Sequence, residues 1–275
     1  MKTILVPTDF SSTALNAAKY AIDLAQTVEA SIVLLHAYQV PVVYAEVPLA
    51  MTDIDIHEEI QQSMLALKNE LARYAPEQIG IKTEIRFGQF FSELENVCQH
   101  LRPYAVVMGC QGSTGVEHFL FGSHAAHAMS HLNWPLITVP GNVTFCSIKK
   151  VGLACDFDQV MEVVPVNDIK RIIQDLDAQL HILNTARPGE HNPDVVHLSS
   201  RLNKKFAPVV PQFHFISSDN IDDGILYFAE EASIDLLIVL PKPHGLLYKL
   251  MHKSHTKQLV LHSQVPVMAL HHCTF

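Results

Sequence analysis

Short apolar runs alternate with helical patterns along the first half of the chain, and this alternation limits the folds open to it more than any other feature. The runs typical of buried strands span residues 3–7, 31–36, 105–108 and 134–139. Residues 14–25 place alanines along one helical stripe, and a long helix is expected from residue 52 or 53 to residue 74. Residues 81–87 alternate apolar and polar side chains, as an edge strand does. The whole pattern predicts a doubly wound α/β fold with a parallel sheet.

The second half repeats this plan. Residues 151–157 resemble residues 5–10, residues 236–240 resemble 106–108, and residues 265–270 resemble 134–139. We therefore predict a tandem duplication, with domains at residues 1–142 and 148–275 and a short linker at 141–148. An edge strand carries unpaired backbone groups, and both 134–139 and 265–270 are apolar. We expect these two strands to pair edge to edge within the chain.

Composition narrows the class of protein. The chain has 275 residues, 48% of them hydrophobic, and a net charge of −9, which argues against nucleic-acid binding. No apolar run reaches the length of a membrane span, and the N-terminus lacks a signal-peptide pattern. We therefore expect a cytoplasmic protein without a membrane segment. The five cysteines include no C-x-x-C pair, which fits reduced thiols.

A glycine-rich loop connects the strand at 105–108 to a helix expected from Ser123. Gly109 and Gly112 allow a tight turn and a close approach of the backbone to a ligand. Gly122 and Ser123 stand where the free N–H groups at the start of a helix favour an anion. The spacing is neither the P-loop pattern nor G-x-G-x-x-G. It predicts a phosphate site, with a plain strand-to-helix connection as the alternative.

The opening strand ends in the carboxylate of Asp9, and the loop has the spacing G-x2-G-x9-G-S before a last helix and strand. In these features the chain resembles the universal stress protein family, and the glycine spacing matches the family's ATP-binding subgroup. The likeness covers residues 1–142 well and the remainder weakly. It implies two flavodoxin-like, or Rossmann-like, domains with strand order 3-2-1-4-5. It also implies a nucleotide-dependent regulator of the stress response rather than a strong enzyme.

The same resemblance implies a site for ATP, ADP or AMP, with or without Mg²⁺, in the first domain. Doubly wound sheets bind ligands where the strand order reverses, which here lies between the first and fourth strands. Pro7, Thr8 and Asp9 would contact the nucleoside, and the backbone of Ala37, just after the second strand, would contact adenine. The ribose and phosphates would be held by Met108, Gly109, Gln111, Gly112, Gly122 and Ser123.

Alternatives stay open at two positions, His124 and Asp9. Many family members carry a small apolar residue and then a hydroxyl residue after the last glycine pair, whereas this chain has His124 and Ala125. One phosphate contact is therefore missing, and we include His124 among the candidate binding residues because its ring could replace that contact. For Asp9, the alternative is a carboxylate that caps the helix beginning near Ser11 or Ser12.

The second half has lost the phosphate loop. Where the first half has Gly109, Gly112 and Gly122, the second half has Leu240, Pro243 and Lys253. Proline has no N–H to donate to a phosphate. We expect the second domain to be a structural partner and the chain to bind one nucleotide.

Other functions stay open as alternatives. No Lys or Arg stands between Arg102 and Lys149, although phosphoryl transfer usually needs a cation at the phosphate. We assign no catalytic residue, and a slow ATPase or adenylyl-transfer enzyme is the rival interpretation. The chain has 17 histidines, and His124, His127 and His131 share one helix face. A metal-binding or apolar-ligand module is therefore a third interpretation, although no tightly spaced metal motif occurs and we assign no metal ligand. A further homodimer also stays open.

Overall fold

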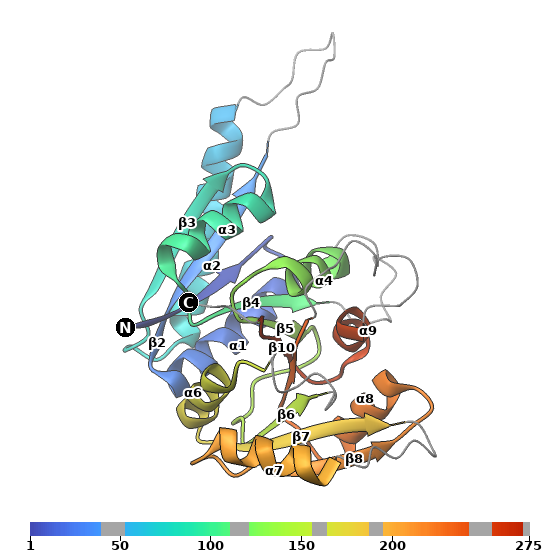
Figure 1. The fold of residues 1–275 in the computed structure, drawn as a ribbon. Coiled ribbons are helices and arrows are strands. Elements are labelled where there is room, and N and C mark those ends of the chain that lie inside the picture. The colour runs from blue at the N-terminus through green and yellow to red at the C-terminus, as the bar shows by residue number, and fades with distance from the viewer. Residues whose placement is uncertain (40–52, 111–120, 156–163, 187–194, 242–254, 272–275) are drawn as a thin grey trace.

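The chain forms one twisted sheet flanked by helices (Figure 1). The computed structural model describes residues 1–39, 53–110, 121–155, 164–186, 195–241 and 255–271. The strands are β1 (Lys2–Pro7), β2 (Ala30–Tyr38), β3 (Ile81–Phe87), β4 (Ala105–Cys110), β5 (Leu136–Pro140), β6 (Lys150–Ala154), β7 (Gln179–Ala186), β8 (Gln212–Ser217), β9 (Leu236–Val239) and β10 (Val267–Ala269). The helices are α1 (Ser12–Val28), α2 (Asp53–Tyr74), α3 (Phe90–Leu101), α4 (Phe121–His131), α6 (Val166–Leu176), α7 (Val195–Phe206), α8 (Ile221–Glu231) and α9 (His255–His262).

The sheet has ten strands in the order β3-β2-β1-β4-β5-β10-β9-β6-β7-β8. The first five strands thus follow the order 3-2-1-4-5, and the last five repeat it in the second half. Neighbouring strands run parallel within each half, whereas β5 and β10 pair antiparallel, with Ile137 opposite Met268. The structure confirms the predicted fold class, strand order and edge-to-edge pairing.

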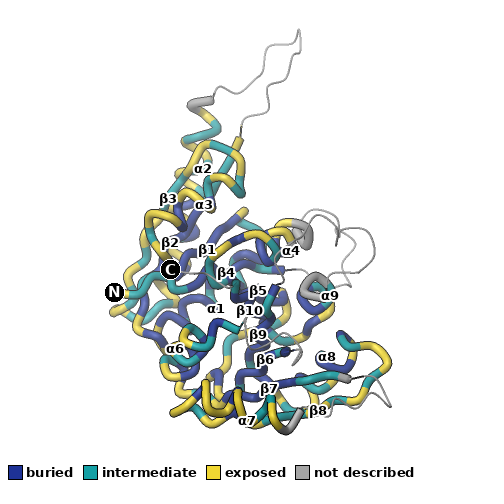
Figure 2. The backbone as a smooth tube through the Cα atoms, in the orientation of Figure 1, coloured by how far each residue is buried: buried dark blue, intermediate teal, exposed yellow. Residues whose placement is uncertain are grey.

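Helices cover both faces of the sheet, which makes three layers. One core contains side chains of α1, α2, α6 and α7, and the other contains side chains of α3, α4, α8 and α9. Successive strand residues alternate between them, so Leu34 lies in the first core and Leu35 in the second. Figure 2 shows the buried residues concentrated along the central strands. Among the described residues, no helix is both long enough and apolar enough to cross a membrane.

Local sequence signals explain the helix that follows β1. The Ser11 hydroxyl accepts a hydrogen bond from the Ala14 N–H at 3.2 Å, so Ser11 is the N-cap of α1. Ala17, Ala18 and Ala21 are fully buried on the stripe predicted from their spacing. The helix ends at Val28 and is capped by Glu29, whose φ of 56° is left-handed.

The structure corrects two local expectations and adds one helix that was not predicted. Ala37 lies inside β2 rather than after it, because β2 pairs with β3 as far as Tyr38. Gly109 lies inside β4, paired with Val139, rather than in a turn. Helix α6 was not predicted, although its buried Ile169, Ile172, Ile173 and Leu176 have helical spacing.

Candidate functional site

The carboxyl ends of β1 and β4 lie at the same edge of the sheet. The two strands are adjacent and parallel, with Leu5 opposite Val106. Strand order reverses here, since β1 continues to β2 on one side and β4 to β5 on the other. This edge is where an open α/β sheet binds a ligand. It brings the turn after Pro7 next to the segment after Met108.

The turn after β1 is held by its own side chains. Thr8 Oγ1 accepts from the Phe10 N–H, and Asp9 Oδ1 accepts from the Ser11 N–H, both at 3.0 Å. Phe10 has a φ of 66°, a conformation that costs a residue other than glycine about 1–2 kcal/mol. Strain of this kind often accompanies functional sites. The turn buries Thr8 and leaves Asp9 exposed to solvent, while Ser11 rather than Asp9 caps the helix.

The backbone of Ala37 extends past the end of β1. Ile32 donates its N–H to the Gly80 carbonyl, and the Tyr38 carbonyl accepts from the Gly88 N–H. The backbone N–H and C=O groups of the even-numbered residues of β2 therefore point toward β3. The backbone groups of the odd-numbered residues point toward β1, as shown by the hydrogen bond from the Thr8 N–H to the Leu35 carbonyl.

The next backbone N–H and C=O of β2 on the β1 side belong to Ala37, but the hydrogen bonds between β1 and β2 end before this residue. The Thr8 carbonyl accepts instead from His36 Nδ1 at 2.8 Å. Within the described part of the chain, the N–H and C=O of Ala37 therefore point past β1 with no backbone partner on that side.

Aromatic side chains at the end of β2 were not predicted as part of the site. The Phe10 ring lies 4.6 Å from the His36 ring, and His36 stacks on Tyr38 at 6.3 Å between ring centroids. The Tyr38 hydroxyl lies 2.8 Å from His57 Nδ1, which joins this row to α2. The signal in the sequence is the pair of aromatic residues that flank Ala37. These rings fix the carbonyl of Thr8 and the end of β2.

Met108 and Gly109 form the end of β4, and packing explains the glycine. A Cβ atom on Gly109 would lie 2.6 Å from the backbone oxygen of Thr13 and 2.7 Å from its Cγ2. Gly109 is thus needed for the close approach of β4 to the first turn of α1. The expectation of a tight turn at Gly109 was wrong, since it is a strand residue, while its contact with a ligand stays a prediction. Met108 is almost fully buried in the second core.

The remainder of the predicted loop is largely outside the described residues. Gln111 and Gly112 are not described, and for Gly122 and Ser123 only the backbone assignment to α4 is. His124 is exposed, and its ring stacks on Phe90 and meets the edge of Phe91, both at 5.4 Å. These contacts hold the His124 ring against α3.

Two buried cysteines lie in the first half of the chain, Cys98 in α3 and Cys110 at the end of β4. Burial raises the pKa of Cys98 to about 12 and that of Cys110 to about 12, so both remain protonated at neutral pH. A thiol in that state is a poor nucleophile and a poor metal ligand.

Comparison with known proteins places the chain in a family. The model of the universal stress protein family matches residues 1–140 and 174–271. The chain belongs to the universal stress protein family. This confirms the resemblance found in the sequence, now in both halves.

Individual universal stress proteins support the same assignment. One from Methanocaldococcus jannaschii is 29% identical over 141 residues, which cover 50% of this chain and 81% of that protein. The crystal structure of one from Archaeoglobus fulgidus DSM 4304 covers 98% of both chains with a TM-score of 0.74 and 17% identity. The crystal structure of a putative universal stress protein from Pseudomonas aeruginosa UCBPP-PA14 has a TM-score of 0.60 and 11% identity. The match covers 98% of this chain and 93% of that chain. At these identities the structures establish the fold.

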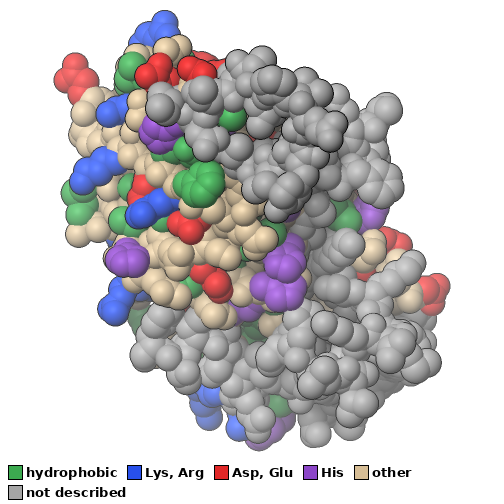
Figure 3. Space-filling model, turned by 90° about the horizontal axis from the view of Figure 1, so that it is seen from above, with side chains coloured by type: hydrophobic (Ala, Val, Ile, Leu, Met, Phe, Trp, Pro, Cys, Tyr) green, Lys and Arg blue, Asp and Glu red, His purple; other side chains and the backbone are tan. Residues whose placement is uncertain are grey.

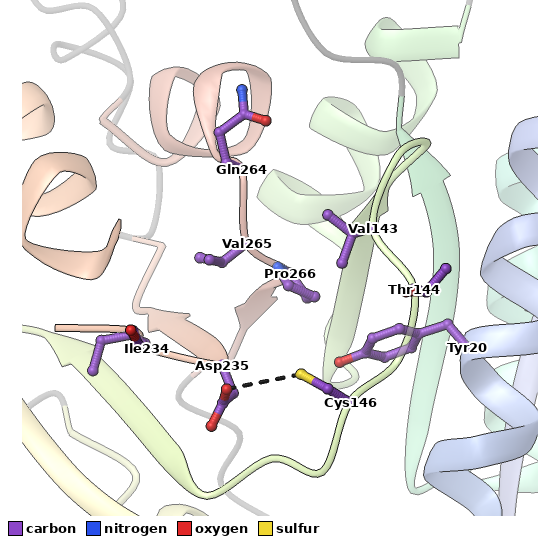
Figure 4. Close-up of a pocket in the computed structure, with 10 residues that line it drawn as sticks. Tyr20, Val143, Thr144, Cys146, Ile234, Asp235, Gln264, Val265 and Pro266 are labelled. Atoms are coloured by element: carbon purple, nitrogen blue, oxygen red, sulfur yellow. Dashed lines mark hydrogen bonds between the residues drawn. The ribbon is translucent and has the colours of Figure 1, made fainter. Parts of the chain in front are cut away.

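A separate cleft lies where the two halves of this universal stress protein meet (Figure 4). It has a volume of about 220 Å³ and is lined by Tyr20, Val143, Thr144, Cys146, Ser233, Ile234, Asp235, Gln264, Val265 and Pro266. None of these is a predicted site residue.

One carboxylate organises this junction. Asp235 Oδ2 accepts from the backbone N–H groups of Lys149 and Lys150, at 2.8 and 2.9 Å, and Oδ1 lies 3.9 Å from the Cys146 sulfur. The Tyr20 side chain points toward this group (Figure 4), and burial raises the pKa of its hydroxyl. Through these hydrogen bonds, Asp235 holds the segment between β5 and β6 against the second half.

Proposed function

We propose that this universal stress protein binds one adenine nucleotide at the carboxyl ends of β1 and β4, and acts in the cytoplasm as a nucleotide-dependent regulator of the stress response. ATP, ADP and AMP, with or without Mg²⁺, are the candidate ligands. The observation that carries the proposal is the backbone of Ala37, which points past the end of β1 at the strand-order reversal.

The exposed groups fit an adenine nucleotide chemically. Adenine presents a hydrogen-bond donor next to an acceptor, and the Ala37 C=O and N–H form the complementary pair. The exposed Asp9 carboxylate uses Oδ1 to hold its turn, and the carboxylate has further lone pairs to accept from a sugar hydroxyl. The glycine loop would supply amides to the phosphates at the start of α4, where the helix dipole favours an anion.

Slow or absent turnover is part of the proposal. Hydrolysis needs a cation or a held metal against the transferring phosphate, and no Lys or Arg occurs between Arg102 and Lys149. The buried thiol of Cys110, at the end of β4, has a raised pKa and is a poor nucleophile. The residues thus suit binding better than phosphoryl or adenylyl transfer.

The second half would complete the sheet without binding a nucleotide. It supplies β10, which pairs with β5 and removes the exposed edge of the first half. Its loop carries Pro243 in place of a glycine amide. One nucleotide per chain is the expected stoichiometry.

Calorimetry with two variants at one position tests the proposal. Ala37→Pro replaces the N–H that faces past β1 by a ring carbon, and it keeps the bonds to β3, because these come from the even-numbered residues on either side. We expect ATP to bind wild type one per chain, and Ala37→Pro to bind about three- to tenfold more weakly. Ala37→Ser keeps the N–H and serves as the matched control, with unchanged affinity.

Equal affinity in Ala37→Pro and Ala37→Ser would show that the end of β2 does not contact the base. Two equivalent sites per chain would contradict the assignment to the first half alone.

A further inference from the structure

The junction cleft between the two halves is small and partly apolar. Its volume is about 220 Å³, whereas an apolar cavity of about 150 Å³ holds a molecule of benzene. Val143, from the segment after β5, and Val265 and Pro266, from the segment before β10, supply apolar lining. The cleft is smaller than the pockets of about 300–1,000 Å³ that hold drug-sized ligands. It therefore fits a ligand of the size of a substituted benzene ring.

One carboxylate sets the charge of this cleft. Among the ten described residues that line it, Asp235 is the only one with a charged side chain. Burial is the main cause that raises the pKa of both Tyr20 and Cys146, so these two groups are neutral at neutral pH. Asp235 Oδ1 lies 3.9 Å from the Cys146 sulfur, and a thiol is only a weak donor.

The positive groups near Asp235 form their contacts elsewhere. Asp235 Oδ2 accepts from the backbone N–H groups of Lys149 and Lys150. The ammonium groups of these lysines instead contact the Asp177 carboxylate, at 3.1 Å, and the Ala232 carbonyl, at 2.8 Å. Within the part of the chain that the structure describes, Asp235 therefore has no ion pair with a lysine or arginine.

A buried hydroxyl group lies beside the same carboxylate. Tyr20 is 2% exposed, and its hydroxyl has no hydrogen-bond partner among the described residues. Figure 4 shows this hydroxyl directed toward Cys146 and Asp235. An unpaired buried hydroxyl is unfavourable, so a ligand that reaches it gains a hydrogen bond that the chain itself does not supply.

We propose that the junction cleft binds a small organic cation that carries at least two N–H groups on an apolar body, such as an amidinium. One N–H would donate to Asp235 Oδ1 in a charge-assisted hydrogen bond, and a second would donate to the Tyr20 oxygen. The apolar body would lie against Val143, Val265 and Pro266. Since these residues come from both halves, the ligand stabilises the contact between the halves by linkage. The cleft shares no residue with the proposed nucleotide site, so the two proposals are independent.

Diffuse attraction is the alternative to a local site. The chain has a net charge of −9, which attracts cations to its whole surface. Acidic and basic side chains are interspersed over the described part of the face in Figure 3, and such a surface attracts a cation without holding it in one place. A local site differs from this attraction because it depends on a single carboxylate.

Calorimetric titration of the full chain with benzamidinium and with benzamide tests the proposal, because the two probes have the same shape and only the first is charged. We expect benzamidinium to bind one per chain, at least about tenfold more tightly than benzamide. Asp235→Asn should abolish this preference, since a carboxamide oxygen still accepts from the N–H groups of Lys149 and Lys150 while the charge is lost. Asp177→Asn is the matched control and should keep the preference, because it removes a carboxylate whose side chain is 97% exposed.

The thiol of Cys146 reports on the cleft of the wild-type chain. Cys146 is exposed, whereas Cys98, Cys110 and Cys155 are buried. Benzamidinium at ten times its Kd should slow the alkylation of Cys146 by iodoacetamide about tenfold, measured on the Cys146 peptide by mass spectrometry. Benzamide at the same concentration should slow it by about twofold or less.

Three results would overturn the proposal. Equal affinity of the wild-type chain for benzamidinium and benzamide would show that the charge of Asp235 is not recognised. Equal loss of the preference in Asp177→Asn and Asp235→Asn would show diffuse attraction. Unchanged alkylation of Cys146 at ten times the Kd of benzamidinium would place the probe outside the cleft. This last measurement decides the question without a substitution if Asp235→Asn fails to fold.

Discussion

Replacing Gly109 by alanine tests whether this glycine serves the packing of α1 or a ligand. The new Cβ would lie 2.6 Å from the Thr13 oxygen and 2.9 Å from the Thr13 carbonyl carbon. Both are backbone atoms, so no rotamer change relieves the overlap, and β4 and the start of α1 must move apart. Overpacking of this kind costs about 1–3 kcal/mol.

Gly80→Ala is the matched control. No heavy atom lies within 4 Å of a Cβ at Gly80, and no positive φ excludes alanine there. The substitution should be neutral or stabilise the fold by about 0.4–1 kcal/mol, because alanine restricts the unfolded chain. The two variants make the same chemical change in the same half of the chain.

Urea unfolding measures the difference. Trp134, the single tryptophan, precedes β5 and reports on the first half. We expect Gly109→Ala to lower the midpoint by on the order of 1 M relative to Gly80→Ala. Adding Thr13→Ala should restore only part of the loss, because it removes Cγ2 and leaves the backbone oxygen. A Gly109→Ala variant with wild-type stability and weakened ATP binding would refute the packing explanation.

Further predictions concern pH, the linker, the glycine loop and turnover. Burial lowers the pKa values of His181 and His214, whose Nδ1 and Nε2 atoms are 2.9 Å apart, so their stabilising contribution is complete above pH 6.5 and lost as the pH falls; amide protection factors, which correct for the intrinsic slowing of exchange in acid, should fall more in β7 and β8 than in β1 and β2 on acidification, and an equal fall would contradict this. Asn16→Ala removes the bonds from Nδ2 to the carbonyls of Pro140 and Val143, and should destabilise the chain by about 1–2 kcal/mol in urea unfolding, whereas no change would show that these bonds are unimportant. Gly112→Val should abolish ATP binding in calorimetry while the circular dichroism stays unchanged, since a β-branched side chain blocks close approach of a phosphate; retained affinity would exclude the loop. ATP turnover should be far below about 10 per second, and a rate of that order would favour an enzyme.

The sheet could be predicted from the sequence because its strands are buried on both faces and therefore continuously apolar. The pairing of β5 with β10 followed from the same property, since Ile137 and Met268 would otherwise be exposed at two edges. The spacing of Ile169, Ile172 and Ile173 also contains the signal for α6, which was missed although no tertiary information is needed to find it.

The details of the site depend on contacts between distant residues. Gly109 has the spacing of a ligand-binding glycine. Only the structure shows that the absence of a side chain lets β4 approach the backbone of Thr13. The bond from His36 to the Thr8 carbonyl, which leaves the Ala37 backbone beyond the end of β1, joins residues 28 positions apart. Periodicity cannot predict such contacts, because they depend on the register between strands and on tertiary packing.

The most direct test of the central claim is a crystal structure of the full chain grown with ATP. We predict one nucleotide per chain at the carboxyl ends of β1 and β4, with the adenine on the backbone of Ala37 and the sugar near Asp9. A nucleotide bound only in the second half or in the junction cleft beside Tyr20, or no bound nucleotide at saturating ATP, would contradict it.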